Sequence, residues 1–305
     1  MTVREFVKAG AALLGAGLSL GGQESAATKL KIGGAAIEVT LGEGGFDLGP
    51  SAILAWVTKA AKAVIEYYGV FPVPQMRIRV NPSERRSGVF GGTTWGQNPP
   101  FTRIFVGRHT TQAELDDDWM MTHELVHTAF PDVDEDHHWI EEGIATYVEP
   151  IARVQIGDLQ ASRIWGDMAR DMPKGEPQAF DEGLDHTHTW GRTYWGGALF
   201  CLVADVRIRQ ASQNRKGLQD ALRGIRAAGG TIEHHWALES AFAVGDQATH
   251  TKVLSKLYSE MKDQPYPVDL NALWSELGVK VYENTVSLDE RAPLAAIRRS
   301  ITLPT

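Results

Sequence analysis

The chain contains the run HELVH at residues 123–127, followed by WIEEGIATY at residues 139–147. Histidines four positions apart on a helix lie on one face, so the imidazoles of His123 and His127 can bind one metal ion. Glu124 lies beside the first histidine, where its carboxylate can take a proton from a metal-bound water. Imidazole is a preferred zinc ligand, and the motif therefore predicts one Zn²⁺ per chain. Such a short run also occurs by chance, as a helix with surface histidines. The surrounding sequence therefore has to decide between that alternative and a metal site.

A helix around this run is predicted by the residues that precede it. Thr111 and Glu114 match a capping box, and Pro131 ends the helical pattern after Phe130. The three acidic residues at 116–118 fit the positive N-terminal end of this helix.

The rest of the sequence predicts an α+β fold. Alternating or β-branched segments predict strands at residues 37–41, 76–80 and 102–106, and the glycine-rich segment 88–107 predicts antiparallel strands around a loop. Helical spacing predicts a helix over residues 51–68 that ends at Gly69. Further helices are predicted at 138–155, 157–172, 191–212, 215–227, 236–243, 247–262 and 269–277. We therefore expect a sheet lobe over residues 29–130, including the metal helix, and a mainly helical lobe over residues 131–305.

Composition narrows the class of protein. The 305 residues are 43% hydrophobic and 22% charged, which is typical of a globular chain. The net charge of −8 argues against a nucleic-acid partner. The single cysteine, Cys201, excludes an intrachain disulfide and a cysteine-rich zinc site, and its apolar neighbours predict a buried thiol.

The N-terminal residues 1–28 have the pattern of an export signal. Arg4 and Lys8 precede an apolar run over residues 9–20, and small residues follow at 25–27. Residues 2–8 also resemble a twin-arginine signal that lacks the first arginine. The pattern predicts a periplasmic or secreted protein without stable membrane insertion, because the apolar run is too short to span a bilayer. An ordinary N-terminal helix is the alternative, and residues 30–48 fit either a strand or a removable propeptide.

The second run resembles the gluzincin metallopeptidases, and the glycyl aminopeptidase and aminopeptidase N families are most similar. Trp-x-x-Glu-Gly-x-Ala-x-Tyr follows the metal motif in those families and matches Trp139 to Tyr147. The resemblance implies a thermolysin-like catalytic domain with Glu142 as the third zinc ligand. Fourteen residues separate His127 from Glu142, fewer than is usual in these families. Gly143 is expected to let this helix approach the metal helix closely.

The segment TYWGGAL at residues 193–199 resembles the family's Tyr-x-x-Gly element. The resemblance implies that the phenol of Tyr194 donates a hydrogen bond to the oxyanion of the tetrahedral intermediate. The alternative is a tyrosine that belongs to the core. His188 precedes this segment and is a candidate for substrate contact, with His186 beside it.

The segment GGTTW at residues 91–95 lies where these families have a glycine-rich edge strand that pairs with the substrate backbone. Gly91, Gly92, Thr93 and Trp95 are therefore substrate-binding candidates, although an ordinary glycine-rich turn fits as well. The aminopeptidase N family has a glutamate here that binds the free amine of the substrate, and this sequence has Thr and Trp instead.

These features predict a zinc-dependent peptidase that hydrolyses a peptide or protein substrate with a metal-activated water. Glu124 and Tyr194 are the predicted catalytic residues, and the predicted ligands are His123, His127 and Glu142. His137 and His138 remain alternative ligands. The enzyme is expected to be aminopeptidase-like, with exo- or endo-cleavage and the oligomeric state left open. The alternatives are an inactive binding protein of gluzincin fold and a zinc hydrolase of non-peptide amides.

Overall fold

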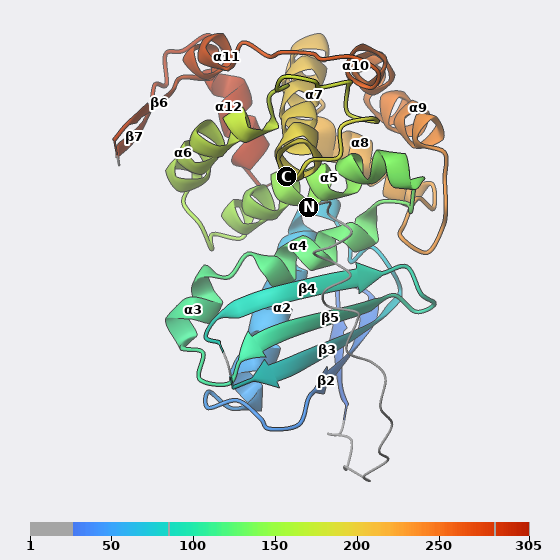
Figure 1. Ribbon diagram of the computed structural model, residues 1–305, viewed down its shortest axis with the longest axis vertical. Coiled ribbons are helices and arrows are strands. Elements are labelled where there is room, and N and C mark those ends of the chain that lie inside the picture. Colours follow the sequence, from blue (N-terminus) through green and yellow to red (C-terminus); the bar gives the residue numbers. More distant parts are fainter. Residues whose placement is uncertain (1–26, 85, 284, 305) are drawn as a thin grey trace.

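The computed structural model describes residues 27–84, 86–283 and 285–304. Residues 1–26, which contain nearly all of the predicted export signal, lie outside the described residues. The chain forms a sheet lobe and a helical lobe, as predicted, with helix α4 (Met120–Val126) at their junction (Figure 1). In the part of the chain that is described, no helix has the length and apolar character needed to cross a membrane.

The sheet lobe is built on five strands in the order β1-β2-β3-β5-β4. Their bounds are β1 Thr28–Ile32, β2 Ala35–Leu41, β3 Gln75–Ser83, β4 Val89–Trp95 and β5 Phe101–Gly107. Strand β2 pairs parallel with β3 and β3 with β5, whereas β1 and β4 are antiparallel to their neighbours. The predicted antiparallel pair within residues 88–107 is therefore confirmed, and β4 forms an edge of the sheet. Because β2 lies between β1 and β3, residues 35–41 belong to the folded domain.

Helix α2 (Pro50–Tyr68) lies behind the sheet (Figure 1) and supplies much of the core of this lobe. Its buried side chains recur at helical spacing, and they include Ile53, Trp56, Val57, Ala60 and Val64. The helix ends at Gly69, whose φ of 80° is left-handed, as the sequence predicted.

The predicted helix from Thr111 to Phe130 is wrong in one respect, because the chain breaks it at Asp118. The capping box of Thr111 is present, but it begins only the short helix α3 (Gln112–Asp117). Asp118 is extended, and its carboxylate accepts hydrogen bonds from the backbone N–H groups of Met120 and Met121. The indole of Trp56 donates to the same carboxylate over 3.0 Å. This carboxylate begins a second helix, α4, and a 3₁₀ turn (His127–Ala129) follows it.

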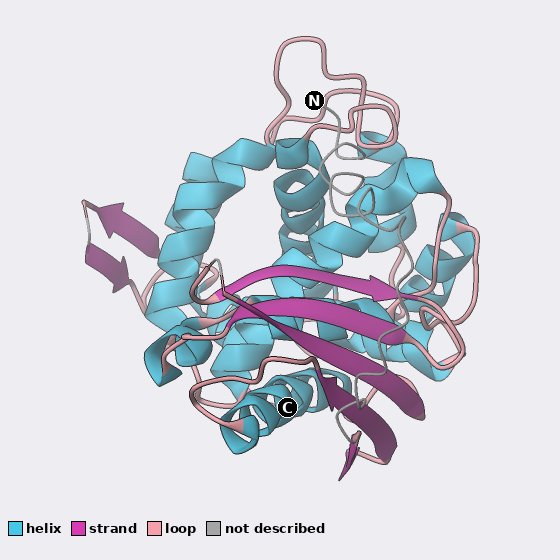
Figure 2. Ribbon diagram, turned by 60° about the horizontal axis from the view of Figure 1, so that its bottom comes forward, coloured by secondary structure: helices cyan, strands magenta, loops and turns pink. Residues whose placement is uncertain are grey.

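The second lobe is helical, as predicted, with differences at its element boundaries. The helices are α5 His138–Gln155, α6 Ala161–Asp171, α7 Gly197–Ala211, α8 Leu218–Ala227, α9 Leu238–Thr249, α10 Val253–Met261, α11 Leu270–Leu277 and α12 Ala295–Thr302. Short 3₁₀ turns lie at Glu135–His137 and Met172–Gly175, and a π-helical segment lies at Gly191–Gly196. The sequence did not predict α12 or the hairpin of β6 (Val279–Tyr282) and β7 (Thr285–Leu288), which lies apart from the main sheet (Figure 2). Helix α9 runs to Thr249, beyond its predicted end.

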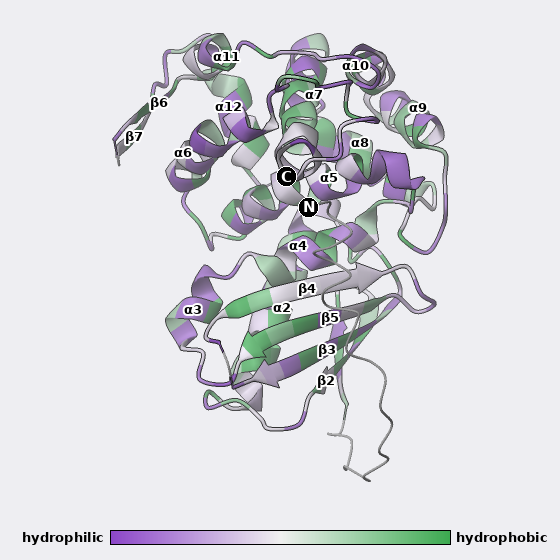
Figure 3. Ribbon diagram, in the orientation of Figure 1, coloured by the Kyte–Doolittle hydropathy of each residue, from purple (hydrophilic) through white to green (hydrophobic). Residues whose placement is uncertain are grey.

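Helix α7 is the central helix of this lobe. Figure 3 shows apolar residues along the visible side of this helix, and 12 of its 15 residues are buried. A helix that is hydrophobic on all sides packs inside other elements rather than against one face. Cys201 is buried in it, as predicted.

Helices α5 and α7 touch backbone to backbone at two glycines. A Cβ on Gly143 would lie 2.3 Å from the carbonyl carbon of Gly197, and a Cβ on Gly197 would lie 2.1 Å from the carbonyl oxygen of Trp139. Either side chain would force the helices apart. Gly143 thus allows a close approach to α7, and the prediction that it approaches the metal helix is wrong. Helix α4 meets α5 through longer side chains instead, among them His123 and Glu142.

Candidate functional site

The two histidines of the HELVH run lie side by side at the junction of the lobes. His123 is 5% exposed in α4, and His127 is the first residue of the 3₁₀ turn that continues it. Their ring centroids are 4.9 Å apart, with the planes nearly perpendicular. The spacing of four residues thus presents both imidazoles to one point.

Helix α5 brings Glu142 to the same point. The distance from Nε2 of His123 to Oε2 of Glu142 is 3.1 Å, and Nε2 of His127 lies 3.8 Å from the same oxygen. One donor atom from each of these three residues lies within 4.8 Å of the other two. Two imidazole nitrogens and one carboxylate oxygen are the donor set of a catalytic zinc site, in which a fourth position stays open. The residues present therefore fit a zinc ion.

The charge states of two of these groups suit metal binding. Burial lowers the pKa of His127 to about 4, so its ring is neutral at pH 7. Burial alone would raise the pKa of Glu142, but the neighbouring His127 and His123 outweigh it and hold that pKa well below its usual range. Burial lowers the pKa of His123, and the contact with Glu142 more than offsets this, so the net direction is upward. Neutral imidazole and ionised carboxylate are the forms that bind metals.

The alternative ligands lie outside this cluster. The ring of His138 contacts Glu141 through Nδ1 at 3.0 Å and the second oxygen of Glu142 through Nε2 at 3.3 Å. His137 instead contacts the hydroxyl of Tyr258 at 3.0 Å. His138 therefore lies beside the carboxylate of Glu142, on the side away from His123 and His127, and orients it.

Glu124 points from α4 toward the edge strand β4. The hydroxyl of Thr94 donates to Oε2 of Glu124 over 2.8 Å, and it also lies 2.7 Å from the hydroxyl of Thr102 on β5. Burial raises the pKa of Glu124 to about 7, and the nearby His123 and the Thr94 hydrogen bond oppose part of this rise. A carboxylate with a pKa near 7 can both accept and donate a proton at neutral pH.

Thr94 was missed by the sequence analysis, which selected its neighbours in the same segment. Alternate residues of a strand share a face, so Gly92 and Thr94 face one way while Gly91, Thr93 and Trp95 face the other. A Cβ on Gly92 would lie 2.7 Å from Cγ of Glu124, whereas a Cβ on Gly91 would meet only Phe105. Strand periodicity therefore contained a signal for Thr94.

The other substrate-binding candidates lie in different surroundings. Trp95 stacks on Phe101 with ring centroids 5.6 Å apart, and the hydroxyl of Thr93 donates to the carbonyl of Gly92. His188 is half exposed, and its ring lies 4.0 Å from Asp136. His186 bonds to Asp263 at 3.0 Å. Neither histidine joins the cluster of His123, His127 and Glu142.

Tyr194 lies in the π-helical segment before α7, with its ring 6.3 Å from that of His123 and nearly parallel to it. Burial raises the pKa of its phenol, and the carboxylates of Glu142 and Glu124 raise it further. The phenol therefore keeps its proton and can act as a hydrogen-bond donor at the site.

Two exposed tryptophans extend this arrangement on both sides. Trp119 is 49% exposed with its ring 5.3 Å from that of His123, and Trp190 is 56% exposed with its ring 5.8 Å from that of Tyr194. Trp119, His123, Tyr194 and Trp190 thus form a row of aromatic rings. Single exposed apolar side chains are common on protein surfaces, but two exposed tryptophans that pack against residues of the candidate site favour a binding surface there.

We predict that Glu142→Ala lowers zinc affinity by about 10-fold or more, because it would remove one of the three candidate ligands. The measurement is zinc content and competition with a chelator, together with the thermal stabilisation that zinc gives to a protein that binds it when folded. Glu141→Ala is the matched control, because this neighbouring carboxylate contacts His138 and not His123 or His127. Equal zinc affinity of the two variants would contradict the ligand assignment.

Comparisons with protein-family models and with curated proteins give no match. Solved structures do match. An aminopeptidase N family protein from Idiomarina loihiensis superposes with a TM-score of 0.62 at 14% identity, over 88% of this chain and 53% of that chain. A variant of the M1 zinc metallopeptidase from Deinococcus radiodurans superposes with a TM-score of 0.51 at 11% identity, over 81% and 53%.

A further structure of a variant of the Deinococcus radiodurans protein, bound to a Tyr-Ser-Ala substrate, superposes with a TM-score of 0.51 at 12% identity, over 80% of this chain and 53% of that chain. This chain spans about half the length of the solved chains that it matches. At these identities the likeness concerns the fold. The chain therefore has the fold found in zinc metallopeptidases of the M1 aminopeptidase N family.

Proposed function

We propose that the protein is a zinc-dependent peptidase with a thermolysin-like arrangement of catalytic groups. The observation that carries the proposal is the meeting of three ligand groups, a buried carboxylate and a protonated phenol at one junction between two lobes. The fold supports the same reaction, since the Deinococcus radiodurans relative is a zinc metallopeptidase and has been solved with a peptide substrate. From the pattern of residues 1–28 we also propose that it acts after export.

In this proposal His123, His127 and Glu142 hold the zinc ion. When bound, zinc polarises the scissile carbonyl and lowers the pKa of a coordinated water to near 7. The chain's own residues perform the proton transfers and hold the substrate.

Glu124 acts as the general base and then as the general acid. The carboxylate takes a proton from the attacking water and later gives it to the leaving amine, and burial, which raises its pKa, favours the protonated form that the second step needs. The Thr94 hydrogen bond fixes which way the carboxylate points, because only one oxygen, Oε2, accepts it. The absence of a side chain at Gly92 leaves space for the carboxylate beneath the strand.

Tyr194 stabilises the negative charge that develops on the carbonyl oxygen. Its phenol keeps its proton, and a positioned donor of this kind contributes most where charge appears in the transition state. Strand β4 lies at the edge of the sheet and is proposed to pair with the extended backbone of the substrate.

The first test is the substitution Glu124→Gln, which keeps the shape of the side chain and removes the base. We expect turnover of a diverse peptide pool to fall by about 100-fold or more, with zinc content unchanged. Mass spectrometry of the products also separates exo- from endo-cleavage, because an aminopeptidase removes single N-terminal residues.

Glu141→Gln is the control for this experiment, and we expect it to retain activity. Peptide cleavage that persists in Glu124→Gln would rule out the proposed mechanism. If zinc binds and neither the wild type nor the variant cuts any peptide, the alternatives of a binding protein or a hydrolase of non-peptide amides become the better accounts.

We predict that Thr94→Val lowers kcat about 10-fold and leaves KM and zinc content nearly unchanged, because the hydroxyl orients Glu124 without touching the substrate. Thr94→Ser should restore most of the loss. The control is Thr93→Val, since that hydroxyl bonds only to the carbonyl of Gly92. A loss of the same size in both variants, or one confined to KM, would refute the positioning role.

The row of aromatic rings predicts a preference for apolar or aromatic substrate side chains. Trp119→Ala and Trp190→Ala should each raise KM by about 10-fold for peptides with an aromatic residue next to the cleaved bond, and much less for glycine peptides. Tyr282→Ala is the control, because Tyr282 is 77% exposed on the separate β6–β7 hairpin. Binding of the same peptides to Glu124→Gln, measured without turnover, checks the result independently. An equal change for both peptide classes would refute this preference.

A further inference from the structure

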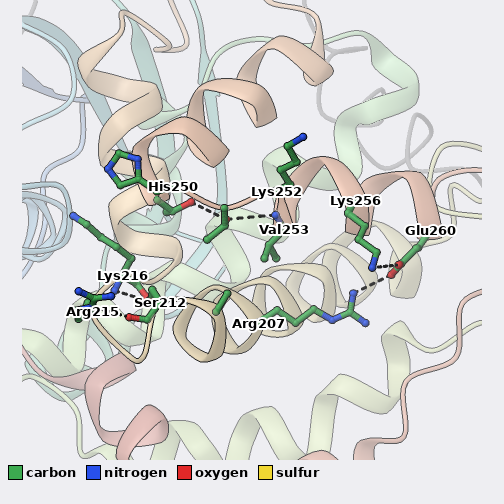
Figure 4. A pocket seen from close by; sticks show the side chains of 12 residues that line it. Arg207, Ser212, Arg215, Lys216, His250, Lys252, Val253, Lys256 and Glu260 are labelled. Atoms are coloured by element: carbon green, nitrogen blue, oxygen red, sulfur yellow. Dashed lines mark hydrogen bonds and ion pairs between the residues drawn. The ribbon is translucent and has the colours of Figure 1, made fainter.

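A hollow of about 720 Å³ lies in the helical lobe, among the C-terminal half of α7, the loop to α8, and the connection from α9 to α10 (Figure 4). It shares no residue with the candidate zinc site. Its lining consists of Arg207, Ala211, Ser212, Arg215, Lys216, Thr249, His250, Thr251, Lys252, Val253, Lys256 and Glu260. We refer to this set as the cationic hollow. Its volume is in the range of about 300–1,000 Å³ that small-molecule sites occupy.

The charge of the hollow is opposite to that of the whole protein. Five lysine and arginine side chains and one glutamate line it, while the chain has a net charge of −8. The basic residues come from separate segments, α7, the α7–α8 loop, the α9–α10 connection and α10, so they are not one solvated helix face. Figure 4 shows them on opposite sides of the hollow.

The internal ion pairs do not neutralise this charge. The carboxylate of Glu260 forms ion pairs with two cations, Arg207 at 2.9 Å and Lys256 at 3.9 Å. Lys216 pairs with Asp220 at 2.9 Å. No acidic group of the described residues lies within ion-pair distance of Arg215 or Lys252, and the Nε of Arg215 donates only to the carbonyl of Ser212. Two full positive charges therefore remain for an external partner.

Both walls of the hollow are held in place by hydrogen bonds. On one side the carboxylate of Asp246 accepts from the backbone N–H groups of Leu254 and Ser255, which fixes the turn that carries Lys252. On the other side the amide of Asn214, next to Arg215, donates to the hydroxyl of Ser300 on α12. The backbone on both walls is thus held in place before any ligand arrives, which lowers the entropic cost of binding.

We infer that the cationic hollow binds a small molecule bearing a di- or triphosphate group. Arginine and lysine are the side chains that proteins use for phosphate, arginine through its planar fork and lysine as a point charge. Ala211, Val253 and the methylene stems of the basic side chains add an apolar floor, which suits a ligand with a less polar part attached to its phosphates. The inference does not depend on the proposed peptidase activity.

The probe for the test is inorganic pyrophosphate, titrated into the full-length protein by calorimetry at constant ionic strength. We expect saturable binding with one site per chain and a Kd below about 1 mM. Sulfate at the same ionic strength should bind at least 10-fold more weakly, because it carries fewer charges. Pyrophosphate should also raise Tm, since a ligand of the folded state stabilises it.

The variant for the test is the double substitution Arg215→Gln with Lys252→Gln, which removes the two unneutralised charges. The matched control is Lys29→Gln with Lys31→Gln, which removes two exposed charges from β1 in the other lobe. We expect the first variant to weaken pyrophosphate binding at least 10-fold and the control to leave it unchanged. Equal loss in both variants would show a general charge effect and overturn the inference, as would wild-type protein without saturable binding up to about 1 mM.

A second titration compares ADP, pyrophosphate and adenosine. Binding of ADP that is tighter than that of pyrophosphate, and lost in the double variant, supports a nucleotide as the source of the phosphates. Equal binding of ADP and pyrophosphate supports a free polyphosphate. Binding of adenosine as tight as that of ADP would mean that the phosphates are not recognised, and would overturn the inference.

Discussion

The backbone contact of Gly143 with Gly197 sets the geometry on which the candidate site depends. Glu142 directly precedes one glycine, and Tyr194 lies three residues before the other. The distance between the Glu142 carboxylate and the Tyr194 phenol therefore follows from how closely α5 and α7 approach. Close packing transmits such a constraint because helices without an intervening side chain have little freedom to slide. The helical lobe presents these two groups as one unit.

The sheet lobe contributes the remaining groups through a second constraint, at the edge of the sheet. The carboxylate of Asp118 begins α4, and His123 and Glu124 lie in the middle of the seven residues of this helix. The indole of Trp56 in α2 donates a hydrogen bond to the Asp118 carboxylate. Strand β4 then approaches Glu124 closely at Gly92 and binds it through Thr94. The site thus forms where the two lobes meet, and each lobe supplies groups that the other lacks.

The sequence predicted the groups whose signal is local, and it missed those set by distant residues. HELVH, the capping box of Thr111 and the glycine stop at Gly69 are short-range patterns, and the structure contains the elements expected from them. The break at Asp118 depends on Trp56, 62 residues away, and the partner of Gly143 is 54 residues away, so neither can be seen in a local window. Thr94 is the exception, because the strand alternation contained a local signal for it and it was still missed. Helix α12 and the β6–β7 hairpin pack on the helical lobe, and weak local patterns did not reveal them.

The position of β4 at the edge of the sheet has a consequence for the release of cleaved fragments. Backbone hydrogen bonds to an edge strand do not distinguish side chains, so an extended chain can pair with it whatever its sequence. If the protein acts as proposed, a cleaved fragment keeps the backbone hydrogen bonds to β4 that held it before cleavage. Long fragments would then dissociate slowly and compete with new substrate, while short ones would leave quickly. Fragment length, rather than the chemistry at Glu124, would set the steady-state rate on long chains.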